Sequence, residues 1–340
     1  MKSYKNILKP LYLYALVALL WSTHAWSASY DVIHFRPDFY PSSFLSVAQP
    51  QIPQALKFYP AFYLDYAYQP LNVVNPTGAH QNMIQHLAVA HLGTSFSLTD
   101  RIAFSASAPF VFEGNFQQIG GTLKSNQWGI GSIELTSRYL LKQHEGDGVG
   151  LGLEPFIHIP SGFDDIYISS NAATGGISAI MDLVSQPYTL ALHMKLHFKP
   201  EDTLGSAYSH DTFTQSIALG YQARPSFSHF FEIHTQTPLE HFFKSQDSSS
   251  IEIRYGFNYA LSEKMSFVFS IGTHILPSTD SPLFRSLIGL KLPLKSSPHM
   301  APEPPASPEI SPTIEAPPQP LPQLPPPHKA ERPRRFLPIH

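Results

Sequence analysis

Beyond residue 55 the chain alternates apolar and polar residues over long stretches. In the stretch from Ile251 to Leu261, IEIRYGFNYAL, the odd positions are large and apolar, whereas the even positions are small, polar or charged. A repeat of two is typical of a β-strand with unlike faces, because successive side chains of a strand point to opposite sides. One face of this strand must therefore meet apolar material, which is either a protein core or lipid.

The same alternation predicts twelve strands and no helix between residues 56 and 294. Most of the runs exceed the usual strand length of about 5 or 6 residues and fit the roughly 9 to 11 that a tilted membrane strand needs. The expected strands are Leu56–Tyr68, Ile84–Leu98, Ile102–Phe112, Trp128–Leu141, Val149–Ile159, Gly176–Val184, Tyr188–Phe198, Thr212–Ala223, Phe227–Thr237, Ile251–Leu261, Met265–Ile275 and Phe284–Leu294.

The connections between these strands are short and long in strict alternation. Thr99–Asp100 and Ser262–Lys264 are short, whereas Gln69–Met83 and Glu113–Gln127 are long and polar. Transmembrane barrels show this asymmetry, with tight turns on the periplasmic side and long loops outside. An even number of strands then places both chain ends in the periplasm. An exported soluble β-sandwich, the alternative fold, has no reason to sort its loops by end.

The composition of the two strand faces favours lipid over a protein core. One face is apolar throughout, as at Ile102, Phe104 and Phe110, and its aromatic residues gather near strand ends like the girdles of membrane barrels. The other face mixes Gly, Ser and Ala with charges of both signs, which we expect to pair across a barrel lumen. The charged residues expected to face the lumen are Asp65, Glu134, Arg138, Glu154, Asp182, Lys195, Glu232, Glu252, Arg254, Arg285 and Lys291.

Composition and charge exclude several classes of protein. Charged residues make up only 14% of the chain, against about 25% in soluble domains. The formal net charge of −3 gives no support for nucleic-acid binding. Cysteine is absent, which excludes disulfides and thiolate metal sites.

The first 27 residues have the order of a bacterial signal peptide. Lys2, Lys5 and Lys9 precede an apolar run from Leu11 to Trp21, and Ala25-Trp26-Ser27 provides a small-x-small cleavage site. We therefore expect residues 1–27 to be a signal peptide that directs the chain to export.

Two flanking segments lack the alternation. Residues 28–55 contain scattered prolines and are interpreted as a periplasmic N-terminal segment, either a lead-in to the barrel or a partial plug. Residues 295–340 are rich in proline and are predicted to be a disordered periplasmic tail of polyproline II character. The basic end of this tail, at Arg332, Arg334 and Arg335, would suit a periplasmic protein or the cell wall.

The sequence offers no convincing catalytic, metal or cofactor site. His193 and His197 share one strand face, but four residues along a strand separate them by about 13 Å, too far for one metal ion unless His158 or His234 completes a site across strands. An outer-membrane phospholipase, the alternative enzyme, would carry Ser and His on the lipid-facing wall, where this chain has mostly aliphatic and aromatic residues, and its histidines mainly face inward. We therefore expect no catalytic residues, no metal and no cofactor.

Six stretches of strand and turn have a pattern that is found in a known family: FRP at 35–37, FLSV at 44–47, YLDYAYQPL at 63–71, LGTSFSLTDRIAFSASAPFVF at 92–112, WGIGSIEL at 128–135 and IPSG at 159–162. These stretches resemble the barrel half of OmpA-family outer-membrane proteins, and the turn style also resembles barrels that transport aromatic compounds. The resemblance implies a bacterial outer-membrane location, contact with lipid, and either a narrow polar channel for a small polar or aromatic solute or a structural barrel closed by ion pairs. After Leu294 the proline-rich tail stands in place of the peptidoglycan-binding domain of the OmpA family, so wall anchorage is not implied.

Overall fold

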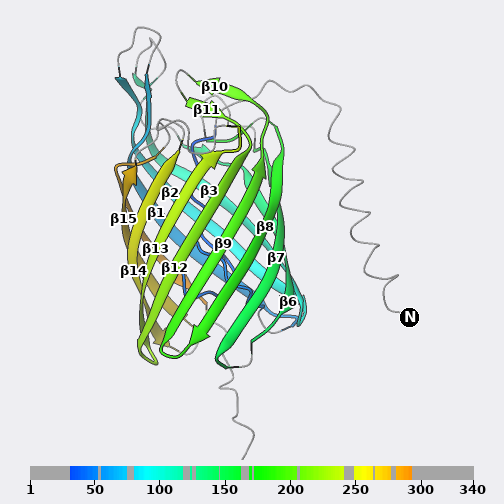
Figure 1. Cartoon of the computed structure of the whole chain (residues 1–340). Coiled ribbons are helices and arrows are strands. Elements are labelled where there is room, and N and C mark those ends of the chain that lie inside the picture. The colour runs from blue at the N-terminus through cyan, green and yellow to red at the C-terminus, as the bar shows by residue number, and fades with distance from the viewer. Residues whose placement is uncertain are drawn as a thin grey trace, which may run out of the picture. The chain divides into compact units, whose positions relative to one another are not determined.

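The computed structural model shows a closed antiparallel barrel of twelve long strands (Figure 1). The barrel closes because β1 pairs with both β2 and β16, while every other long strand pairs with its neighbours in sequence. The predicted fold class is confirmed. The long strands are β1 (Phe58–Val74), β2 (His80–Thr99), β3 (Ile102–Gln117), β6 (Ile133–Lys142), β7 (Gly148–Ile159), β8 (Thr174–Ser185), β9 (Tyr188–Phe198), β12 (Thr212–Arg224), β13 (Phe227–Pro238), β14 (Ser250–Ser262), β15 (Met265–Leu276) and β16 (Phe284–Lys291).

The structure describes residues 31–52, 55–74, 80–117, 123–124, 128–144, 146–161, 168–170, 172–204, 207–240, 249–262, 265–276 and 281–292. The predicted signal peptide and the predicted proline-rich tail lie outside these ranges. Within them, no helix has the length and apolarity required to cross a membrane.

The predicted facing of the strands is confirmed by the burial pattern. In β14, Glu252, Arg254 and Gly256 are buried, whereas Tyr255 and Tyr259 are exposed on the opposite face. β9 has exposed aromatic residues at both ends, Tyr188 and Phe198, as expected for aromatic girdles. The odd positions of the stretch 251–261 therefore point outward.

The observed strands differ from the predicted ones at the long-loop end of the barrel. β1 and β2 extend well into the expected loop 69–83, and the loop 199–211 contains a hairpin of β10 (Asp202–Leu204) and β11 (Ala207–Ser209). The short strand β4 (Leu123–Lys124) pairs with the end of β3. These extensions are polar or irregular in sequence, so a period of two does not reveal them.

The expected strand 128–141 is interrupted. It divides into β5 (Gly129–Ile130) and β6, and the backbone N–H of Gly131 donates instead to the carbonyl of Pro109 at 2.8 Å. A Cβ atom at Gly131 would lie 2.6 Å from Ile33 and 2.7 Å from Pro109. The break is therefore a place where the backbone approaches residues inside the barrel more closely than any side chain would allow.

We predict that the cost of an outward charge depends on its depth along β15. Ile271 near the middle and Ile275 near the end of this strand are 42% and 64% exposed on the same face. Ile271→Arg should cost about 2 to 4 kcal/mol and Ile275→Arg about 0 to 1 kcal/mol, because arginine is disfavoured most at the bilayer midplane. Reversible unfolding from lipid vesicles measures both values. Equal costs would contradict the membrane placement of this strand.

Candidate functional site: the occupied barrel interior

Residues 31–52 run through the inside of the barrel, as the blue trace within the strands in Figure 1 shows. The Oγ of Ser132, just before β6 at the long-loop end, donates to the carboxylate of Asp31 at 3.2 Å. The side chain of Gln49 donates to Asp182, near the short turn after β8, at 3.2 Å. The segment therefore extends from one end of the barrel to the other. These contacts match the partial plug among the two interpretations of residues 28–55.

Aromatic side chains of this internal segment fit against small residues of the wall. Phe39 and Phe44 are buried, and the wall residues opposite them include Gly93 and Gly220. A Cβ atom at Gly220 would lie 3.2 Å from the ring of Phe44, and one at Gly93 would overlap the ring of Phe39. Small residues on the inward face thus make room for the segment. Phe39 and Phe44 belong to a buried hydrophobic cluster formed by the segment and the wall. Its other members are Phe35, Leu45, Val47, Tyr63, Ala191, Ala218, Phe230, Val268 and Leu287.

Arg138 of β6 is a fully buried charge of the interior, with no exposed side-chain surface. Its guanidinium donates to the carboxylate of Glu154 at 2.7 Å, to the carbonyl of Gln49 at 2.7 Å and to the carboxylate of Asp38 at 3.1 Å. The ring of Tyr40 covers it at 3.8 Å. One wall cation therefore holds three groups of the internal segment, and two carboxylates offset its charge.

Glu232 of β13 is a second anchor. Its carboxylate accepts hydrogen bonds from the backbone N–H of Leu45 at 2.7 Å and from the backbone N–H and hydroxyl of Ser46 at 3.2 and 2.7 Å. Arg254 lies 3.3 Å from the same carboxylate and 2.6 Å from Glu252. The carboxylate replaces water as the partner of two buried backbone amides, which would otherwise be costly to bury.

Two further wall residues bind carbonyl groups of the segment. The ammonium of Lys291 donates to the carbonyls of Ser42 and Phe44 at 3.1 and 2.8 Å. The amide of Asn258 donates to the carbonyl of Ser43 at 2.7 Å. Successive carbonyl groups of an irregular chain are thus satisfied without secondary structure.

The eleven charged residues that the sequence assigns to the lumen all lie on the long strands. Ten of them are buried, and Lys195 is half-buried. Arg138, Asp182, Glu232, Arg254 and Lys291 contact the internal segment. The others mainly pair across strands: Asp65 and Glu252 with Arg285, Glu134 with Lys195 and His158, and Glu154 with Arg138.

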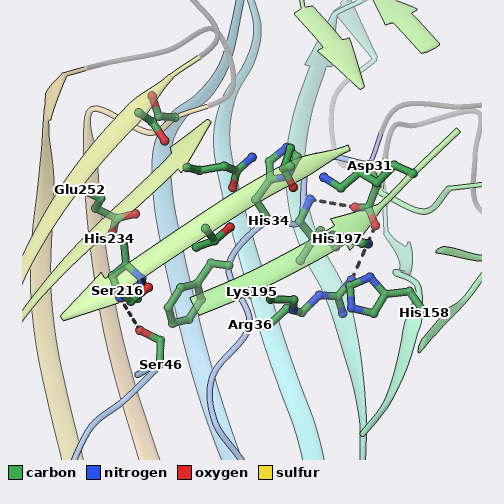
Figure 2. Close-up of a pocket in the computed structure, with 18 of the residues that line it drawn as sticks. Asp31, His34, Arg36, Ser46, His158, Lys195, His197, Ser216, His234 and Glu252 are labelled. Atoms are coloured by element: carbon green, nitrogen blue, oxygen red, sulfur yellow. Dashed lines mark hydrogen bonds and ion pairs between the residues drawn. The ribbon is translucent and has the colours of Figure 1, made fainter. Parts of the chain in front are cut away.

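The interior retains a cavity of about 170 Å³ toward the long loops, which we call the upper cavity (Figure 2). A smaller cavity of about 40 Å³ lies against the segment residues 36–40. Four residues line both cavities: Arg36 and Ser46 of the segment, and His193 and Lys195 of β9. These four side chains therefore mark the boundary between the two spaces.

Two histidines that line the upper cavity, His158 and His197, bond to neighbouring protein groups. His158 contacts Glu134 at 2.6 Å through its Nε2, and His197 contacts Thr174 at 2.8 Å through its Nε2. The rings of His158 and His197 meet edge to face with centroids 4.8 Å apart. The Nε2 atoms of both histidines are thus already bonded to protein groups and are not available to bind a metal ion.

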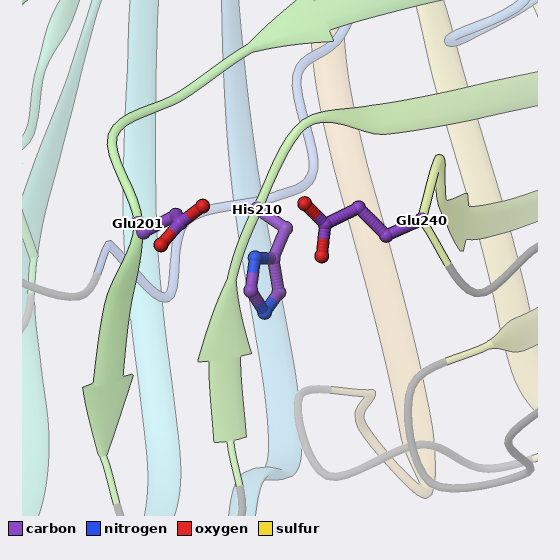
Figure 3. Close-up of side chains that lie close together, drawn as sticks. All are labelled: Glu201, His210 and Glu240. Carbon is purple, nitrogen blue, oxygen red and sulfur yellow. The ribbon is translucent and has the colours of Figure 1, made fainter.

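Three other residues of types that can bind a metal ion lie close together, and none of them was considered in the sequence analysis. The ligand atoms of Glu201, His210 and Glu240 lie within 4.8 Å of one another at the long-loop end (Figure 3). The two carboxylates are exposed, and exposed acidic groups often gather without an ion. Sequence reasoning missed this group because its members come from two separate loops.

His234 connects the wall to the internal segment. The hydroxyl of Ser216 on β12 lies 2.7 Å from its Nδ1, and the hydroxyl of Ser46 lies 2.7 Å from its Nε2. Ser216 is 1% exposed. The imidazole therefore bridges two hydroxyl groups, and this arrangement orients the segment.

Comparisons with known proteins agree with a membrane barrel. Residues 57–276 match the family described as "Putative MetA-pathway of phenol degradation". An outer-membrane channel from Pseudomonas putida F1 is similar at 15% identity and a TM-score of 0.56, over 71% of this chain and 97% of the other. The KdgM porin (9% identity, TM-score 0.45, 69% and 99% coverage) and the Ralstonia pickettii toluene transporter TbuX (10%, 0.41, 72% and 92%) are more distant.

The comparison with curated proteins finds no match. The expected likeness to outer-membrane barrels is confirmed at the level of fold, and the matched family covers more than half of the residues. The chain thus has the β-barrel fold of an outer-membrane channel, and it belongs to the family described as the putative MetA pathway of phenol degradation.

Proposed function

We propose that this protein is an outer-membrane channel for small polar or aromatic solutes, whose path is narrowed by its own residues 31–52. The observation that carries the proposal is the pair of cavities within the closed barrel, which meet at Arg36, Ser46, His193 and Lys195. A polar, charged interior is suited to a water-filled path. A barrel that serves only as a structural element does not need a polar interior.

The size of the barrel is compatible with a narrow path. Eight strands leave an interior that side chains just fill, and sixteen leave an open channel, so twelve strands lie between these limits. The internal segment then reduces the free space to the two cavities. Solutes that pass without displacement of the segment would have to be very small.

The OmpA relationship belongs to this proposal and rests on the quoted sequence stretches alone. A structural barrel closed by its ion pairs is the main competing function, because the Arg138 and Glu232 anchors also rigidify the interior. The phospholipase-like enzyme has no supporting observation: on the outward faces of the described strands, His86 and His229 pair with tyrosine hydroxyls at 2.7 and 2.6 Å. A periplasmic partner of the tail remains a proposal based on composition.

The first test is removal of residues 31–52. We predict that the shortened barrel has a larger single-channel conductance in planar bilayers than the complete protein, because the segment occupies the lumen along its length. Retention of the barrel is checked by the heat-dependent mobility of the folded protein in gels. An unchanged or absent conductance in a folded variant would contradict the channel and favour the structural barrel.

The second test concerns the Glu232 anchor. Glu232 accepts three hydrogen bonds from the segment, and a hydrogen bond to a charged group contributes about 1.5 to 3 kcal/mol. Glu232→Ala should therefore shift the equilibrium between bound and released segment by about a hundredfold or more. We expect chymotrypsin to cleave the folded variant after Phe44, as mapped by mass spectrometry, while the native segment is protected.

Two variants control for this result. Glu113→Ala removes an exposed carboxylate of β3 and should leave the segment protected. Glu232→Gln keeps an acceptor oxygen for the amides of Leu45 and Ser46 and should give intermediate cleavage. Equal protection of all three variants would show that this carboxylate does not hold the segment.

A further inference from the structure

Five lysine and arginine side chains line the upper cavity, together with the carboxylates of Asp31 and Glu252. Arg254 pairs with Glu252 and Glu232, and Arg285 pairs with Asp65 and Glu252. Arg36 and Lys195 lie farther from their nearest carboxylates, at 3.6 Å from Asp31 and 3.7 Å from Glu134. The fifth residue is Lys199.

Arg36 has hydrogen-bonding capacity that the described residues leave unused. Its side chain is 8% exposed, and its Nη1 donates to the carbonyl of Ser132 at 2.8 Å. Its Nε and Nη2 are buried and have no hydrogen-bond acceptor within the described ranges, and the carboxylate of Asp31 stands 3.6 Å from Nη2. A buried guanidinium with two unused donors is costly unless a further acceptor binds it.

The neighbours of Arg36 at the cavity boundary add to this capacity. The Nε2 of His193 is also buried without a hydrogen-bond partner in the part of the chain that the structure describes. The ammonium of Lys195 lies 3.7 Å from the carboxylate of Glu134 and 3.8 Å from the ring centroid of Phe156. Arg36, His193 and Lys195 all border both cavities, so their donors are available to one ligand in this region.

The size and lining of the cavity indicate what else a ligand of Arg36 would contain besides an acceptor group. Cavities of about 150 Å³ can hold a benzene molecule, and the volume of this one is about 170 Å³. Ile33, Phe35, Pro200 and Pro282 give it apolar surface beside the polar groups. A carboxylate matches the planar fork of arginine, and a single ring matches the apolar lining and the volume.

We propose that the upper cavity binds a small organic carboxylate with a single ring, held through its carboxylate by Arg36 and Lys195 at the boundary between the two cavities. This proposal rests on the proposed channel function, because it specifies the class of solute that the channel would carry. It would allow the barrel to select an anionic solute ahead of the narrow part of the path.

Isothermal titration of the complete protein in detergent micelles tests this directly, with benzoate as the probe. Benzamide has nearly the same shape without the charge, and we expect it to bind at least about tenfold more weakly, because a hydrogen bond to a charged group is the stronger kind. Inorganic phosphate should also bind more weakly than benzoate, since it makes no use of the apolar lining. Equal binding of benzamide, or equal or tighter binding of phosphate, would overturn the proposal.

Matched variants locate the site. Arg36→Gln and Lys195→Gln should each weaken benzoate binding by about tenfold or more. Lys142→Gln, which removes an exposed cation near a short turn, should bind like the native protein. Lys195 belongs to the wall, so its variant tests the site even if Arg36→Gln loosens the segment. Native affinity in both site variants would overturn the proposal.

Titration requires no conduction, so the two proposals fail separately. Binding of benzoate without conductance would support the binding site and contradict the channel function. Conductance without binding of benzoate would support the channel function and contradict the binding site.

Discussion

The interior of this barrel depends on one constraint: every polar group of an irregular chain that is buried there needs a partner. Residues 31–52 satisfy some of these groups among themselves, as where the amide of Asp38 donates to the carbonyl of Leu45, and the wall satisfies others. Glu232 accepts from two backbone amides, and Lys291 donates to two carbonyls. Arg138 donates to a further carbonyl and to Asp38. These inward charges of the strands are therefore the complement of one particular segment.

This constraint explains why acidic and basic residues are balanced on the inward face. A buried charge is tolerated when an opposite charge and enough hydrogen bonds surround it. Arg254 illustrates the arrangement, since it contacts two carboxylates and lies over the ring of Phe35 at 4.4 Å. The same networks that satisfy these charges also determine how firmly the segment is held. Control of the path and stability of the interior are thus consequences of the same contacts.

Some buried polar atoms have no hydrogen-bond partner among the described residues, and they occur in both halves of the interior. Arg36 and His193 keep such nitrogen atoms beside the two cavities, and Ser95 and Ser97 keep such hydroxyl oxygens near the short turn after β2. Unsatisfied buried groups are expected where a ligand or water completes the network. Arg36 and His193 differ from the serines because both line a cavity with room for a ligand.

The barrel could be predicted from the sequence. Strand number, strand facing and the order of short and long connections are local properties, because the side chains of each strand alternate between its two environments. Ile251–Leu261 shows this, since its odd residues point outward as its pattern predicts. The sequence also predicts which charged residues face inward, but it does not reveal their partners.

The partners of those charges depend on contacts between distant parts of the chain. Residues 31–52 have no period, and their contacts join positions far apart in the chain: Asp38 with Arg138, and Leu45 with Glu232. The buried aromatic residues Phe35, Phe39 and Phe44 were a signal that this stretch packs against something. Their partners, among them Gly93 and Gly220, became recognisable only when the closed barrel placed them opposite the rings. The cavity, and the unsatisfied donors of Arg36 and His193 beside it, likewise exist only because distant strands and the internal segment meet in one confined space.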